Sequence, residues 1–145
     1  MMATTFTIDR GTGIIRIGTV AALEAGQRRS AIEPGMTDWL TGFRDHGNGY
    51  AWLDLGDLTF GGQPASLALC FHEDRLEQAS WSVRLSGVKP DWLGRAAIDA
   101  ELAFVHATLG RDMGITVGPT DWGEVWSCFD AKGGMASNGL RYSRA

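Results

Sequence analysis

Apolar and polar residues alternate along the middle and the last third of the chain. In the stretch 50–55, Leu53 and Leu55 alternate with Trp52 and Asp54, which is the two-residue period of a strand with two unlike faces. Comparable stretches follow at 65–72, 76–85, 123–129 and 135–142. The first three stretches predict a meander and the last two a hairpin, because short turns rich in glycine or charge separate them.

Other periods predict the elements around these strands. Residues 6–8 and 14–17 are β-rich runs joined by a glycine loop, which predicts an opening hairpin, and segments 20–25 and 37–40 have the signals of short helices. From Pro90 to Gly110, apolar residues recur at helical spacing. The sequence therefore predicts one α+β domain over residues 1–145. Its expected core is a single antiparallel sheet of about five to seven strands, with the long helix packed on one face and the short helical segments near the N-terminus.

Alternate residues of each predicted strand point to opposite faces of the sheet, and we call each such set of residues a parity. The two parities differ in chemistry. One parity is almost wholly apolar and should form the core: Leu53, Leu55, Leu67, Leu69, Phe71, Trp81, Val83, Leu85, Val125, Phe129, Leu140 and Tyr142. The other parity is polar, yet it carries three aromatic residues beside arginine and acidic residues. Trp, Tyr and Arg concentrate binding energy in protein interfaces. This face is thus the candidate partner-binding surface, with Tyr50, Trp52, Asp54, Glu124 and Trp126 as its contact residues. The alternative is that the opening hairpin or a short helix covers the rings.

The net charge of -4 comes from the middle of the chain. Between residues 50 and 80, five acidic residues face one arginine, and the flanking segments are balanced. This distribution argues against a nucleic-acid partner and an anionic membrane surface, and it favours a cationic partner.

Few residues indicate a compartment, a metal or a reaction. The longest apolar run, 67–71, is five residues, far short of the ~20 needed to cross a bilayer. The first residues lack the pattern of a cleaved leader, and Cys70 and Cys128 lack paired spacing, so reduced thiols in the cytoplasm are expected. No metal site, cofactor or catalytic residue is predicted.

The stretches 50–55, 61–64, 67–71 and 122–130 resemble, in layout and turn spacing, small bacterial α+β proteins, several of which are similar to immunity proteins. The resemblance implies a cytoplasmic, non-catalytic protein that masks the active site of a toxin, with a basic toxin domain as the expected partner. Two other hypotheses stay open. One is a small enzyme or ligand-binding protein in which Cys70, His72 and Arg84 converge in a pocket on the same face. The other is a homodimer joined through the aromatic face, in place of a monomer.

Overall fold

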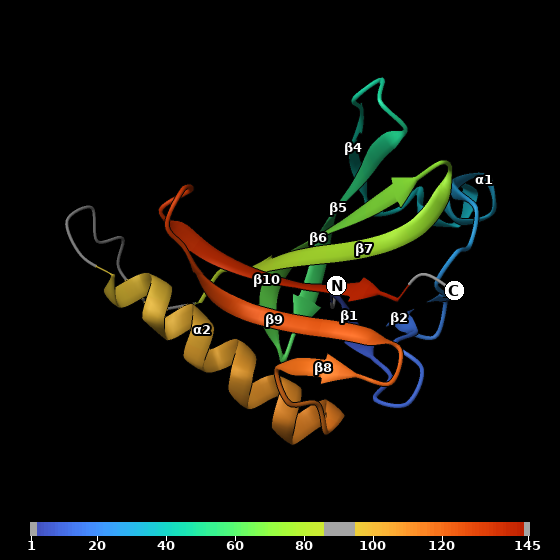
Figure 1. Ribbon diagram of the computed structural model, residues 1–145. Helices are drawn as coiled ribbons and strands as arrows, with labels where there is room; N and C mark the ends of the chain where they lie inside the picture. The colour runs from blue at the N-terminus through green and yellow to red at the C-terminus, as the bar shows by residue number, and fades with distance from the viewer. Residues whose placement is uncertain (1–2, 86–94, 144–145) are drawn as a thin grey trace.

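The strands of the protein form one mixed sheet. The computed structural model describes residues 3–85 and 95–143, and Figure 1 shows how its strands curve around one another. The ten strands are β1 (Thr4–Ile8), β2 (Ile15–Ile17), β3 (Ala21–Leu23), β4 (Leu40–Asp45), β5 (Tyr50–Phe60), β6 (Gln63–His72), β7 (Arg75–Val83), β8 (Gly118–Thr120), β9 (Gly123–Asp130) and β10 (Met135–Tyr142). Their order is β3-β2-β1-β5-β6-β7-β10-β9-β8, and β4 also pairs with β5. The β1–β5 pair is parallel, and the other strand pairs are antiparallel.

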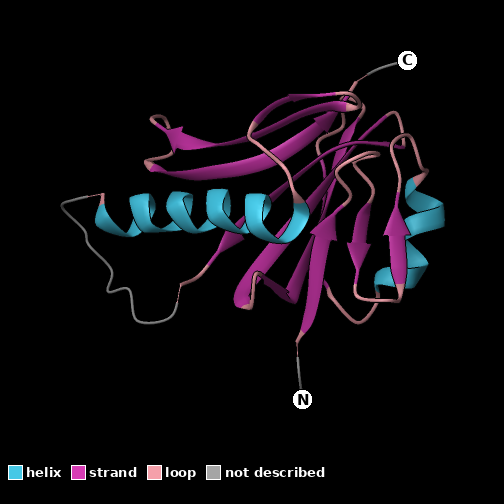
Figure 2. Cartoon of the chain, turned by 90° about the horizontal axis from the view of Figure 1, so that it is seen from below, coloured by secondary structure: helices cyan, strands magenta, loops and turns pink. Residues whose placement is uncertain are grey.

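The helical segments lie at two separate places on this sheet. The first is α1 (Arg29–Ile32), continued by the 3-10 turn η1 (Glu33–Met36), and the second is α2 (Ala96–Thr108), continued by the π-helical turn η2 (Leu109–Met113). In Figure 2 these two segments lie toward opposite ends of the sheet. No helix in the described ranges is long and apolar enough to cross a membrane.

The predicted meander and both predicted hairpins are confirmed. Strands β5, β6 and β7 pair in sequence, β9 pairs with β10, and β1 pairs with β2. Ten of the twelve residues assigned to the apolar parity are buried, and Leu85 and Phe129 are half-buried. The two-residue period was therefore a sufficient guide to the long strands, since each has one face in the core.

The predicted fold class is wrong. The prediction was a single antiparallel sheet of five to seven strands with one long helix on its face. The described residues instead form ten strands in one mixed sheet and two short helices. Three strands were missed. Strands β3 and β8 have three residues each, too few to display a period, and β4 has six residues that are almost all exposed, so it has no buried face to produce one. The parallel β1–β5 pair joins segments more than fifty positions apart in the chain, and no local pattern records such a pairing.

Two local predictions near the N-terminus are also wrong. The segment 20–25 contains β3 in place of a helix, because pairing with β2 sets Leu23 opposite Ile15 and buries it. Tertiary pairing here outweighs the helix propensity of an alanine-rich stretch. The segment 37–40 leads into β4, and the short helix begins earlier, at Arg29. The expected start of the long helix at Pro90 lies outside the described residues.

The N-terminal strands, more than α2, cover the apolar face of the meander. Phe6 of β1 packs against Phe60 and Trp81, with ring centroids 5.2 Å and 6.2 Å away. All three residues are buried, Phe6 and Phe60 completely. Each such side chain contributes about 1.5–3 kcal/mol on burial. The opening hairpin is therefore part of the main core and, among the described residues, leaves Ser66 and Ser82 on the opposite face of the meander exposed.

The sheet curves until the loop between β1 and β2 contacts the C-terminal strands at Gly13. The Tyr142 hydroxyl donates a hydrogen bond to the Gly13 carbonyl at 2.6 Å, and the Trp122 indole N–H donates to the Arg10 carbonyl at 2.9 Å. The rings of Trp122 and Tyr142 pack on one another with centroids 5.8 Å apart. The loop between β1 and β2 thus joins the last strands of the chain.

A buried polar network fixes α2 to the sheet. Asn138 is 1% exposed; its amide group donates to the Trp81 carbonyl at 3.2 Å and to Glu101 Oε2 at 2.9 Å. Its side-chain oxygen accepts a hydrogen bond from Ser127 Oγ at 2.7 Å. Glu101 Oε2 also accepts the backbone N–H of Val83 at 3.2 Å. One helical carboxylate thus holds two strands, β7 and β10, through donors that would otherwise lack partners.

Candidate functional site

The five residues predicted as a contact surface lie on the outer face of the sheet, in two separate groups. Tyr50, Trp52 and Asp54 belong to β5, and Glu124 and Trp126 belong to β9. Strands β6, β7 and β10 lie between them. At about 4.8 Å per strand, the two groups are about 19 Å apart across the sheet. The structure therefore places them on one face and does not bring them into one patch.

In the first group an arginine of β4 links a tryptophan to a carboxylate. Arg44 donates two hydrogen bonds to Asp54, at 3.0 Å and 2.7 Å, and its guanidinium lies 5.5 Å from the centre of the Trp52 ring. These hydrogen bonds hold the pKa of Arg44 above its ordinary value. Asp54 is thus already neutralised within the chain and offers a partner no free charge.

The second group repeats this combination on β9 and β10. The indole N–H of Trp126 donates to Ser137 Oγ at 3.0 Å, and the Arg141 guanidinium lies 5.9 Å from the ring centre. Arg141 also lies 3.8 Å from Glu124. The ring is so close to Gly139 that a Cβ at this position would overlap it. Each group therefore presents a tryptophan, an arginine and a carboxylate, held in place by contacts within the chain.

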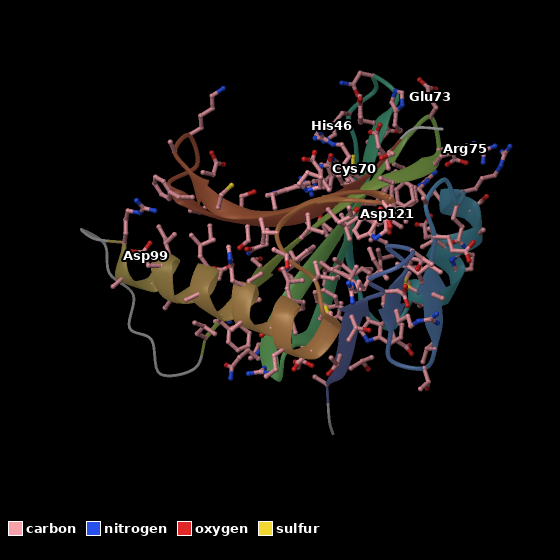
Figure 3. All side chains as sticks on the ribbon, turned by 60° about the horizontal axis from the view of Figure 1, so that its bottom comes forward. His46, Cys70, Glu73, Arg75, Asp99 and Asp121 are labelled. Carbon is pink, nitrogen blue, oxygen red and sulfur yellow. The ribbon has the colours of Figure 1, made fainter. Side chains whose placement is uncertain are left out.

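Tyr50 of the first group packs on a different residue from Trp52 and Asp54. Its ring stacks on His72, with centroids 4.5 Å apart. It borders a separate hollow of about 490 Å³ that also contacts Glu77, Gln78 and Arg141. His72 and Glu73 lie at this end of the sheet, and Figure 3 shows Glu73 and His46 there, with Asp99 at the other end on α2.

Small side chains form the floor between the two groups. Ser66 lies opposite Ser82 in the β6–β7 pairing, with the two hydroxyls 3.0 Å apart. Ala68 lies opposite Ser80, and the β7–β10 pairing continues that row to Gly139. The hollow above this floor has a volume of about 520 Å³ and is bordered by Asp54, Asp130 and Met135. The face is thus a shallow open depression between two Arg–Trp pairs.

The three residues of the proposed ligand pocket do not converge. Cys70 and His72 lie on β6, whereas the backbone N–H of Arg84 bonds to the Pro64 carbonyl at the other end of that strand. The separation of eight positions between Pro64 and His72 corresponds to about 26 Å along a strand. Cys70 is buried, and burial, followed by the charge of Glu77, raises the pKa of its thiol to about 11. The thiol is therefore protonated near neutral pH and is a poor nucleophile.

The two cysteines should differ sharply in reactivity. Cys128 is exposed and Cys70 is buried. With a disulfide reagent at about pH 8, we expect the native protein to react at one thiol and the protein unfolded in guanidinium chloride at two. A Cys128→Ser variant should lose the fast reaction. Rapid reaction of both thiols in the native state would contradict the burial of Cys70.

Within the described residues, no group of three or more histidine, cysteine or acidic side chains is arranged to hold a metal ion. The sequence analysis missed the buried network of Asn138 and Ser127, although both residues alternate in phase with the core residues Leu140 and Val125. Two polar residues that face each other on paired strands, at positions expected in the core, could have predicted the buried network.

Comparisons with known protein families, curated proteins and solved structures find no match for this chain.

Proposed function

We propose that the protein is a non-catalytic module that binds another protein with the outer face of its sheet. Following the resemblance to immunity proteins, the partner is a toxin that the module masks in the cytoplasm. The single observation that supports this proposal is the pair of Arg–Trp groups, Arg44 with Trp52 and Arg141 with Trp126, on either side of a floor of small side chains.

Such groups suit an interface for two physical reasons. Tryptophan and arginine account for the largest losses of binding energy in alanine scans, about 2 kcal/mol or more each at the centre of an interface. Here both rings are half-buried and held by hydrogen bonds or stacking within the free chain. Little side-chain entropy is therefore left to lose on binding, which favours affinity.

The test uses the chain as bait in a lysate of its source organism, followed by calorimetry with the purified partner. We expect Trp52→Ala and Trp126→Ala to weaken binding by on the order of thirtyfold each, the equivalent of about 2 kcal/mol. The matched control is Phe43→Ala, because Phe43 is also an exposed aromatic residue stacked by an arginine, Arg29 at 4.4 Å. Phe43 pairs with Leu53 across β4 and β5, so it lies on the opposite face of the sheet from Trp52 and outside the proposed interface.

Three results would contradict the proposal: no protein partner, unchanged affinity in both tryptophan variants, or an equal loss in Phe43→Ala. Thermal unfolding of each variant separates a lost contact from a lost fold. A dimer in solution that Trp126→Ala converts to a monomer would assign the face to self-association instead.

A further inference from the structure

The outer face carries a continuous depression that is longer than the space between the two Arg–Trp groups. Three hollows of about 520, 500 and 630 Å³ adjoin, since the first two share Gly56, Ser66 and Ser82 and the last two share Asp57 and Pro64. We call this the furrow and define it by those three hollows. Where the first two hollows adjoin, Ser82 of β7 is paired with Ser66 of β6, and Gly56, at the irregularity of β5, lines both hollows with them.

Charge along the furrow is mostly negative. Asp130 and Asp54 border the first hollow, Asp57 and Arg84 the second, and Asp38 with Asp57 the third. Arg44 neutralises Asp54, but Asp38, Asp57 and Asp130 form no ion pair within the described part of the chain. Three carboxylates therefore face one guanidinium over a floor of hydroxyl groups.

Most of the acids that the charge count of the sequence brought forward do not border the furrow. Asp74 lies 3.6 Å from Arg29, and Glu73 lies 3.9 Å from His72, at the turn between β6 and β7. Only Asp54 and Asp57 of the middle segment border the furrow, where Asp38 and Asp130 join them from other parts of the chain.

We infer that the segment of the partner protein that lies in the furrow is cationic, with lysine or arginine side chains directed at Asp38, Asp57 and Asp130. This inference rests on the proposed function and names the chemistry of its partner. Complementary charge speeds capture and excludes acidic competitors. The serine hydroxyls accept hydrogen bonds from ammonium and guanidinium groups. The distance from β9 to β5 is about 19 Å, which about six extended residues span.

The test uses a deca-lysine peptide as the probe and a deca-glutamate peptide as its counterpart, each titrated into isotope-labelled protein at low salt. We expect deca-lysine to shift the amide signals of Gly56, Asp57, Ser66 and Ser82, and deca-glutamate to shift none of them. The combined variant D38N/D57N/D130N should bind deca-lysine on the order of tenfold more weakly.

The matched control, D45N/D112N/D121N, makes the same change in net charge at exposed aspartates that do not border the furrow. We expect it to bind deca-lysine within about twofold of the wild type, because screening weakens distant charges. An equal loss in both combined variants would show a response to net charge alone, and signal shifts confined to other acidic loops would place the cation elsewhere. Either result overturns the inference.

The two proposals fail in different ways. If the partner binds D38N/D57N/D130N as tightly as the wild type and loses affinity for Trp126→Ala, the face binds proteins and the cationic segment is wrong. If deca-lysine occupies the furrow but the tryptophan variants leave partner binding unchanged, the furrow attracts cations and the proposed interface is wrong. A Ser82→Trp variant, which fills the floor without changing charge, should reduce both interactions if both proposals hold.

Discussion

Replacement of Asn138 by alanine is expected to lower the free energy of unfolding by about 3 kcal/mol. The side chain makes three hydrogen bonds in a site that is 1% exposed. Its loss leaves the Trp81 carbonyl, the Ser127 hydroxyl and one carboxylate oxygen of Glu101 short of a partner, and each unsatisfied buried group costs about 1–3 kcal/mol. Urea unfolding followed by tryptophan fluorescence measures this change.

Asn48 supplies the matched control. It is exposed, and its side-chain oxygen accepts one hydrogen bond, from the Tyr50 N–H at 3.2 Å. We expect Asn48→Ala to cost less than about 1 kcal/mol, since water replaces the lost partner. Equal effects of the two substitutions would show that the network between α2 and the sheet contributes little to stability.

Replacement of Gly13 by alanine should be the second large loss, about 3 kcal/mol. Gly13 has a φ of 75°, and a Cβ there would lie 2.6 Å from the Trp122 ring and 2.9 Å from the Tyr142 ring. The left-handed conformation costs a non-glycine residue about 1–2 kcal/mol. Forcing a methyl group into a packed site adds about 1–3 kcal/mol.

Gly26→Ala separates these two contributions. Gly26 has nearly the same φ, 74°, but a Cβ there would meet nothing within 4 Å. We expect this variant to lose only the conformational part, about 1–2 kcal/mol. Thermal unfolding of both variants tests the difference, and equal losses would mean that the contact between Gly13 and the two rings is not tightly packed.

Long strands were predictable from sequence because each displays its period over six or more residues. Strands β5, β6, β9 and β10 all fall where the alternation placed them, with Leu53, Leu69 and Leu140 in the core. The three-residue strands had different outcomes. Strand β2 was predicted because glycine turns flank it, whereas β3 and β8 were missed. The strands that close the sheet depend on partners far away in the chain.

For the candidate site, parity correctly put Trp52, Asp54 and Trp126 on one outer face but gave no strand order. The interposed β6, β7 and β10 separate the residues that appeared to form one group. Arg44 was missed because β4 was not recognised as a strand. Its ion pair with Asp54 means that this carboxylate is already neutralised within the chain and is not a free charge for a partner. A charge count records how many acids a segment has, whereas only packing shows which of them remain available.

The contact between the β1–β2 loop and the C-terminal strands also bears on the synthesis of the protein. The hydrogen bonds that close it join residues 112 and 129 positions apart, and contacts of such long range slow folding. At a ribosomal rate of about 5–20 residues per second, the opening hairpin emerges about 6–26 seconds before its C-terminal partners. During that interval Phe6 of β1 already has its core partners Phe60 and Trp81 available, whereas the hydrogen bonds from Trp122 and Tyr142 to the β1–β2 loop form only after β10 has left the ribosome.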